Sequence, residues 1–252
     1  MTVTCLCPTY GRFSKLRESL ACFLAQDYPD RRLLILNDAS KPIELDTFDG
    51  MEMVTVLNWT APIPNLGEKR QVLLMLAHTE LSAHWDDDDL YLPWHLSESI
   101  VRIEKGVGMT KVRSAWVLQG GAIVGKQNQG NDATLVFRTK MALDLGGYPR
   151  KQIGQGIALL QAFQRRHCYV ALNQNELLSF IRRGWPPKGG ERPRGEEFAR
   201  ANQDFGAGQK LVPADLGELY RIVLRDTYEV LGSTSHQELE RRLAPWTTSC
   251  PA

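Results

Sequence analysis

The stretch HWDDDDLYLPWHL (residues 84–96) places four consecutive aspartates between apolar, aromatic segments. Adjacent carboxylates repel one another, so a folded chain keeps such a run where water or a cation offsets the charge. Trp85 and the apolar residues that follow the run indicate that it lies against the core. This setting favours a cation site over a solvated acidic turn.

Upstream of the aspartates, short apolar segments alternate with segments of helical periodicity. The pattern predicts strands over 2–8, 31–38 and 53–58, a fourth strand that runs into the aspartates, and helices over 12–25 and 68–78. This alternation is typical of βαβ units around a mostly parallel, buried sheet flanked by helices. The sequence therefore predicts an α/β fold.

Polar residues follow three of these strands where each strand ends. Thr9 and Tyr10 follow the first strand, and Asn37 and Asp38 follow the second. The aspartates at 86–89 follow the fourth strand. Ligands of parallel α/β sheets bind outside the carboxyl ends of the strands, so we expect a binding site at this edge.

Alternation along a strand predicts how the four aspartates divide. Side chains two positions apart point the same way, so Asp86 and Asp88 share a face. Two converging carboxylates suit a hard divalent cation, Mn²⁺ or Mg²⁺, whose other ligands are water and substrate phosphates. Asp87 and Asp89 are expected to point elsewhere, as supporting residues.

Beyond residue 109 the pattern is less regular. It predicts a strand at 134–138, a short helix stopped by two glycines, a helix at 154–166, two further strands and a helical C-terminal end. The segment 184–197 is rich in proline, glycine and charge, which indicates a loop. Residues 182–200 carry six basic and three acidic residues, so this basic loop could contact an anionic group. Its Trp185 could stack on a sugar or a base.

Composition restricts the class of protein. The 252 residues are 43% hydrophobic and carry a net charge of +1, so nothing global indicates a nucleic-acid or anionic-membrane partner. Five cysteines without C-x-x-C spacing indicate reduced thiols, and we expect a cytoplasmic protein. There is no signal-peptide pattern and no apolar run long enough for a membrane span.

Four sequence blocks together resemble a known family. CPTYGR (7–12), LLILNDAS (33–40), NLGEKRQVLLMLAH (65–78) and WDDDDLYLP (85–93) are similar, in order and spacing, to the blocks of GT-A-fold, family 2-like glycosyltransferases. TLVFRTKMALDLGGYP (134–149) continues the likeness. The resemblance implies a Rossmann-like GT-A domain with a nucleotide-sugar-binding half (1–108) and an acceptor-side half (109–183). Residues 184–252 then form the basic loop and a helical C-terminal appendage.

The resemblance also implies a set of site residues. Asp86 and Asp88 match the D-x-D that binds the metal and the sugar diphosphate, with Asp88 as the more direct ligand. Arg70 matches an arginine that approaches the nucleotide and would stabilise the departing diphosphate. The residues placed at the nucleotide-sugar are Pro8, Thr9, Tyr10, Arg12, Asp38, Gly67, Arg70, Asp86 and Asp87.

One expected feature is missing. Inverting members of the family use a carboxylate, usually from a Glu-Asp pair that opens a helix, to take the acceptor proton. Here Gln155 and Gly156 stand at that place, and neither can accept a proton. Another carboxylate could serve, with Asp144 as the candidate base and Asp132 as an alternative, although Asp144 is expected to face solvent. Otherwise the transfer retains configuration and needs no such base, or the protein binds without turnover.

The predicted function is therefore a metal-dependent, hexosyltransferase-like enzyme. It would move a sugar from a nucleotide diphosphate donor, a UDP-sugar first of all, to an acceptor hydroxyl on a glycan, a small molecule or a modified DNA base. The alternative is a non-catalytic nucleotide-sugar-binding module. A dehydrogenase of Rossmann type is disfavoured because no G-x-G-x-x-G follows the first strand.

Overall fold

A seven-stranded sheet forms the centre of the computed structural model, which describes residues 1–45, 51–128, 132–172, 179–183, 210–211 and 213–247. The strand order is β11-β7-β10-β5-β1-β2-β4. In that order the strands span Tyr169–Leu172, Met109–Val112, Val136–Arg138, Leu81–His84, Val3–Thr9, Arg31–Asn37 and Val54–Asn58. Only β10 pairs antiparallel with its neighbours within this described sheet, so the predicted mostly parallel α/β sheet is confirmed.

Alternating side chains of the central strands bury both faces of the sheet. In β1, Cys5 and Cys7 belong to one core cluster, whereas Leu6 belongs to the other. In β2, Ile35 and Leu36 divide in the same way. Both faces therefore need a covering of helices, which explains the continuous apolar character of these strands.

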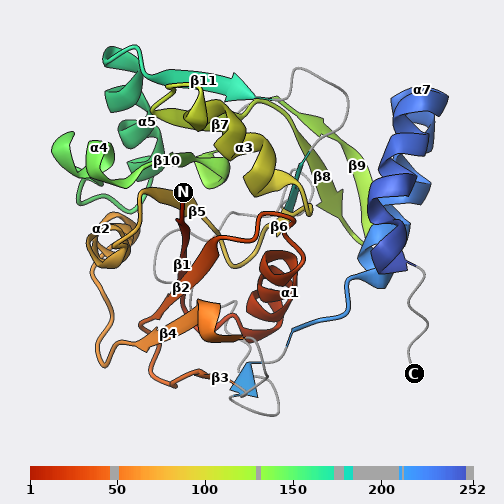
Figure 1. The fold of residues 1–252 in the computed structure, drawn as a ribbon. Coiled ribbons are helices and arrows are strands. Elements are labelled where there is room, and N and C mark those ends of the chain that lie inside the picture. Colours follow the sequence, from red (N-terminus) through yellow and green to blue (C-terminus); the bar gives the residue numbers. More distant parts are fainter. Residues whose placement is uncertain (46–50, 129–131, 173–178, 184–209, 212, 248–252) are drawn as a thin grey trace, which may run out of the picture.

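Two groups of helices supply that covering (Figure 1). Helices α1 (Phe13–Leu24) and α3 (His95–Glu104) contribute to the first core cluster. Helices α2 (Leu66–Leu76), α4 (Thr139–Asp144) and α5 (Gln155–Arg165) contribute to the second cluster. Helices α1, α2, α4 and α5 lie where the sequence predicts helices.

A second sheet of four strands was not predicted in full. Its order is β6 (Leu90–Tyr91), β12 (Phe180–Arg183), β8 (Ala115–Gln119) and β9 (Ala122–Gln127). Strands β8 and β9 form a hairpin whose turn carries Gly120 and Gly121 at φ 60° and 77°. A Gly-Gly pair between two strands is a recognised hairpin signal, and it stands in the sequence. Strand β3 (Glu44–Leu45) pairs with β13 (Lys210–Leu211) in a small third sheet.

The predicted helical C-terminal end is α7 (Gly217–Thr247), which packs against β9 (Figure 1). His236 Nε2 donates a hydrogen bond of 2.8 Å to Leu224 O. A straight helix would separate residues twelve positions apart by about 18 Å, so α7 folds back on itself. Tyr220 and Leu243, from its two arms, lie in the same core cluster.

Short 3-10 turns complete the described chain, at η1 (Met51–Met53) and η2 (Asp132–Thr134). The central sheet takes strands from both sides of residue 108, so the segments 1–108 and 109–183 share one sheet. The predicted loop at 184–197, with Trp185, lies outside the described residues. No helix among the described residues is long and apolar enough to cross a membrane.

Candidate functional site

The aspartate run follows β5 at the carboxyl edge of the central sheet. Trp85, fully buried, stacks on Tyr91 with ring centroids 3.9 Å apart and lies edge-on to Phe23. The Tyr91 hydroxyl accepts a hydrogen bond of 2.8 Å from Asp86 N. The run is therefore anchored to the core at its start, as the sequence predicts.

Asp87 is turned into the protein. Its Oδ2 accepts hydrogen bonds from Thr9 Oγ1 at 2.6 Å and from Arg12 Nε at 3.0 Å, and its Oδ1 pairs with Arg12 Nη2. Burial raises the pKa of Asp87 to about 6, although the Arg12 guanidinium opposes the shift. Asp87 therefore joins the ends of β1 and β5 and holds Arg12 in place.

The other three aspartates converge. One carboxylate oxygen each from Asp86, Asp88 and Asp89 lies within 4.8 Å of the others, a grouping that could hold a metal ion. The expectation that Asp89 points elsewhere is wrong, because the run lies in a turn rather than at the end of a strand. Strand alternation therefore does not govern the side chains beyond β5.

Two arginines and a backbone amide contact these three carboxylates. Arg70 Nη2 lies 2.5 Å from Asp86 Oδ1, and Arg12 Nη1 lies 2.6 Å from Asp88 Oδ2. The Arg183 amide donates to Asp89 Oδ1 at 3.1 Å. Arg12 thus bridges Asp87 and Asp88, and the two arginines offset much of the negative charge.

The electrostatic balance differs among the three. Burial raises the pKa of Asp86, but the charge and hydrogen bond of Arg70 together with other nearby groups outweigh burial and leave that pKa below its usual value. Burial together with the charges of Asp88 and Asp86 raises the pKa of Asp89 well above its usual value. Negative charge at Asp89 is therefore not fully offset by the protein itself. Three converging carboxylates with residual repulsion fit the oxygen ligands that Mg²⁺ and Mn²⁺ prefer.

A buried ion pair lies at the neighbouring strand end. Lys69 Nζ pairs with Asp38 Oδ1 and donates to Thr9 O, and Asp38 Oδ2 accepts from Ile63 N at 2.8 Å. Burial lowers the pKa of Lys69, with Asp38 opposing the shift. Lys69 was not among the residues predicted from the sequence. The feature that could have identified Lys69 is its position next to Arg70, because α2 buries both side chains.

The remaining strand-end residues have local roles in the structure. Asn37 Oδ1 accepts from Ala39 N at 3.2 Å and its amide donates to Lys41 O at 2.9 Å, so Asn37 caps the turn after β2. The Lys69 ammonium lies 5.7 Å from the ring centroid of Tyr10. Pro8 is buried in β1 at a position beyond the pairing with β5, where its missing N–H costs no hydrogen bond to that strand.

Gly67 meets the protein's own backbone. A Cβ built at Gly67 would lie 2.0 Å from Pro149 O, and Gly67 N donates to Lys151 O at 3.0 Å. The first turn of α2 therefore approaches the segment after α4 too closely for any side chain. The assignment of Gly67 to the nucleotide site remains a prediction, as do the assignments of Pro8, Thr9, Tyr10, Arg12 and Asp38.

A histidine and a tyrosine connect β5 with the acceptor-side segment. His84 Nδ1 lies 2.5 Å from Asp132 O, and His84 Nε2 lies 2.5 Å from the Tyr148 hydroxyl. Burial lowers the pKa of His84 to about 3, so the ring is neutral. Because the backbone carbonyl can only accept, Nδ1 carries the proton and Nε2 accepts from Tyr148. Sequence reasoning assigned no role to His84 or Tyr148.

The proposed base Asp144 lies apart from this network. It pairs with Lys140 Nζ at 2.7 Å, one turn away on α4, and its side chain is 60% exposed. The expectation that it faces solvent is confirmed. Gln155 is buried at the start of α5, and Gly156 lies against the Asp132 side chain.

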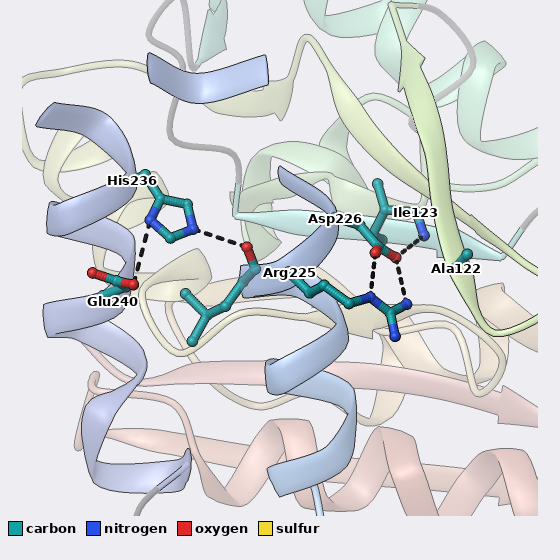
Figure 2. A pocket seen from close by; sticks show the side chains of 7 residues that line it. Ala122, Ile123, Arg225, Asp226, His236 and Glu240 are labelled. Atoms are coloured by element: carbon teal, nitrogen blue, oxygen red, sulfur yellow. Dashed lines mark hydrogen bonds and ion pairs between the residues drawn. The ribbon is translucent and has the colours of Figure 1, made fainter. Parts of the chain in front are cut away.

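A hollow separate from the aspartate site lies between β9 and α7 and has a volume of about 620 Å³ (Figure 2). Its lining residues are Ala122, Ile123, Leu224, Arg225, Asp226, His236 and Glu240. Arg225 pairs with Asp226, and His236 lies 3.5 Å from Glu240. These charged groups are paired within one helix, in contrast to the converging aspartates.

Solved structures resemble this chain over nearly its whole length. S. aureus TarS 1–349 in complex with UDP matches at 14% identity and a TM-score of 0.58, over 98% of this chain and 70% of that chain. The same TarS fragment with UDP-GlcNAc matches at 15% identity and a TM-score of 0.58, over 98% and 71%. The mannosyltransferase PcManGT from Pyrobaculum calidifontis, with GDP-Man and Mn²⁺, matches at 15% identity and a TM-score of 0.53, over 99% and 81%.

The chain has a GT-A fold. The expected fold class is thereby confirmed by similarity in structure, at identities that carry the fold and not the substrate. No protein-family model and no curated protein matches the sequence.

Proposed function

We propose that this GT-A protein is a metal-dependent glycosyltransferase. It moves a sugar from a nucleotide diphosphate-sugar, a UDP-sugar first of all, to an acceptor hydroxyl. The observation that carries the proposal is the convergence of Asp86, Asp88 and Asp89 within 4.8 Å at the carboxyl edge of the sheet, with Arg70 beside them. The likeness to structures that contain UDP, UDP-GlcNAc, and GDP-Man with Mn²⁺ supports it.

The aspartates and Arg70 assist the departure of the nucleoside diphosphate in different ways. Asp86, Asp88 and Asp89 would hold Mn²⁺ or Mg²⁺, and the Asp88 side chain is 32% exposed, more than that of Asp86 at 23%. When bound, the ion neutralises negative charge on the diphosphate. Arg70 adds a fixed positive charge beside the same oxygens, and this charge counts most in the transition state, where the leaving group becomes more negative.

The nucleotide lies along the ends of β1 and β2 in this proposal. Thr9, Tyr10 and Asp38 stand there, and the Lys69–Asp38 pair fixes the loop that carries Asp38. Arg12, bound to Asp87 and Asp88, keeps the turn in a conformation that presents the carboxylates. The acceptor is a glycan, a small molecule or a hydroxylated DNA base, and a panel of these three classes separates them.

Calorimetry tests donor binding directly. Titration of UDP and of GDP into the protein with Mn²⁺ should show binding that EDTA abolishes. Asp88→Asn should weaken the binding of UDP with Mn²⁺ by at least about tenfold, because a ligand oxygen loses its charge. Glu218→Gln, an exposed carboxylate on α7 that pairs with Arg221, is the matched control and should bind as the unaltered protein does.

Turnover is tested on UDP-GlcNAc, UDP-glucose and GDP-mannose with Mn²⁺, by release of UDP or GDP into water and to each acceptor class. Release that depends on the metal supports the transferase. Absence of nucleotide binding with Mn²⁺ would contradict the proposal at its first step.

A second candidate is a binding module that does not turn the donor over. One observation favours it, namely that Gln155 and Gly156 stand where the family carries its base. Binding of UDP with Mn²⁺ but no release from any donor would establish the module in place of the enzyme.

A further inference from the structure

The carboxylates at the sheet edge differ in whether their oxygens are engaged. Asp86, Asp87 and Asp88 pair with arginines, Asp38 pairs with Lys69, and Asp89 accepts from a backbone amide. Within the described part of the chain, no group donates a hydrogen bond to the Asp132 side chain, which is half-buried. Asp132 therefore has oxygens that are free to accept a proton.

Asp132 lies next to the proposed catalytic groups. Its charge acts on both Arg70 and Tyr148, each of which is fully buried, and Arg70 itself contacts Asp86. The geometry agrees, because a Cβ built at Gly156 would lie 2.6 Å from Asp132 Oδ2 and 3.2 Å from Cε1 of His84, the last residue of β5. Asp132 belongs to η2, in the acceptor-side segment, and not to the turn after β5.

The backbone around Asp132 is held firmly. His84 donates to Asp132 O at 2.5 Å, and the Tyr91 hydroxyl donates to Ala133 O at 3.1 Å. The same hydroxyl accepts from Asp86 N, so one side chain connects the Asp132 segment with the aspartate turn. The position of Asp132 relative to the cluster is thus set by two short connections.

The first turn of α5 has room for this carboxylate only because residue 156 is glycine. A Cβ built at Gly156 would lie 2.6 Å from Asp132 Oδ2 and 3.2 Å from Asp132 Cβ. The Asp132 carboxylate therefore occupies the space into which a side chain at position 156 would project. A carboxylate is present beside the opening of α5, although it comes from another element.

We infer that Asp132 is the acceptor-side base of this protein and that it replaces the carboxylate missing at Gln155–Gly156. The inference rests on the proposed transferase function. The acceptor oxygen forms a bond to the anomeric carbon from the face opposite the diphosphate. The bond from that carbon to the phosphate oxygen breaks, and the nucleoside diphosphate leaves with the electron pair. The Asp132 carboxylate takes the hydroxyl proton, and the transfer inverts configuration.

The test uses the full chain with UDP-GlcNAc or GDP-mannose, Mn²⁺ and water as the acceptor, and measures UDP or GDP release. Asp132→Asn keeps the shape of the side chain and removes the proton acceptor. Release should fall by about 10²–10⁴-fold. UDP binding with Mn²⁺ should stay within about twofold of the unaltered protein, because the aspartate cluster is intact.

A reciprocal exchange separates a base from a structural residue. Gly156→Ala should displace the Asp132 side chain and reduce release while UDP binding remains. The double variant Asp132→Gly/Gly156→Asp places the carboxylate on α5 instead and should recover at least about tenfold of the lost rate relative to Asp132→Gly. A residue that only supports the fold would not be rescued in this way.

The outcomes distinguish the two proposals. If UDP does not bind with Mn²⁺, the proposed function fails. If UDP binds and Asp132→Asn releases nucleotide as fast as the unaltered protein, or if Asp144→Asn is the variant that loses release, the assignment of Asp132 is overturned alone. Binding with no release by the unaltered protein also overturns it, since no base then operates.

Discussion

Ion pairs at the carboxyl edge of the central sheet, which carries Asp38 and Asp86–Asp89 and is called the aspartate edge below, differ from those on α7 in burial and in sequence separation. At the edge, Arg12 and Asp87 are 75 positions apart in the sequence and largely buried, and Lys69 and Asp38 are 31 apart and buried. On α7, Glu238 pairs at 2.8 Å with an arginine three positions away, and that arginine is 73% exposed. Burying ion pairs seldom improves stability, whereas exposed helical pairs cost and contribute little. The edge is therefore the region whose charges need a reason other than stability.

The raised pKa values at the edge indicate what that reason is. Burial raises the pKa of Asp87 to about 6 although Arg12 opposes the shift, and burial with the charges of Asp88 and Asp86 raises the pKa of Asp89 well above its usual value. The protein's own cations thus leave negative charge uncompensated at this edge. A divalent cation that arrives with an anionic substrate would complete the compensation, which is the behaviour expected of a binding site.

The largest expected effect concerns Arg70. Arg70→Lys keeps a positive charge beside Asp86 but loses the planar guanidinium that bonds to it. The rate of metal-dependent nucleotide release should fall by about 10²–10³-fold, because the charge no longer meets the leaving group in a fixed geometry. Arg242→Lys, which alters an arginine of α7 paired with Glu238, is the matched control for release kinetics. Equal losses in the two variants would remove the functional distinction between the regions.

The next effect is on stability. Lys69→Met leaves the Asp38 carboxylate buried without its cation, and the free energy of unfolding should fall by about 3–5 kcal/mol in urea titrations. Lys69→Met/Asp38→Asn removes both charges and should regain most of the loss. If the single variant is as stable as the unaltered protein, the pair is not buried in solution as it is in the structure.

A smaller effect depends on pH and on His95, an uncharged buried group near the aspartates. Burial lowers the pKa of His95 to about 3, and the rings of Tyr91 and Phe180 lie beside it. In the unfolded chain His95 takes up a proton near pH 6.5, whereas in the folded chain it stays neutral. The free energy of unfolding therefore decreases as the pH falls from 6.5 toward 3.

The His95→Leu variant removes this proton from the balance. Between pH 6.5 and pH 5.5, the unaltered protein should lose about 1 kcal/mol more unfolding free energy than the variant, measured in urea at each pH. His84, with a similar pKa, is present in both proteins and cancels in the difference. Identical pH slopes would show that His95 has the same pKa in the folded and the unfolded chain, and would contradict the prediction.

Much of the fold could be predicted because the central strands bury both faces. In the run RRLLILN, four successive apolar residues leave no polar face over its centre. Such a run is either a strand covered on both faces or part of a buried helix, and its short length favours the strand. The hairpin of β8 and β9 was harder to predict, because Val124, Gly125 and Lys126 on β9 are all exposed and show no alternation of buried and exposed side chains. There the turn carried the information in Gly120 and Gly121.

The ends of β1, β2 and β5 could be placed at one edge of the sheet from the sequence, but the side chains that meet there could not. The aspartate run drew attention by its own charge, but the direction of Asp89 depends on a turn that the strand pattern does not reveal. In the sequence Lys69 has the features of an ordinary helical cation, because its contacts with β1 and Asp38 appear only in the structure. The approach of Asp132 to Gly156 joins residues 24 positions apart and is a property of the fold alone.

The smallest expected effect belongs to α7 and completes the comparison. Glu238 accepts hydrogen bonds of 2.8 Å from Arg241 and Arg242, and these bonds lower its pKa to about 2. Water screens this partly exposed group, so Glu238→Gln should change the Tm by less than about 1 °C. Added NaCl should shrink even this difference, since exposed pairs lie in the screened regime, whereas the loss in Lys69→Met should persist in high salt. A Glu238→Gln loss that rivals that of Lys69→Met would mean that the helix depends on its exposed charges, and burial would then no longer explain how the two regions differ.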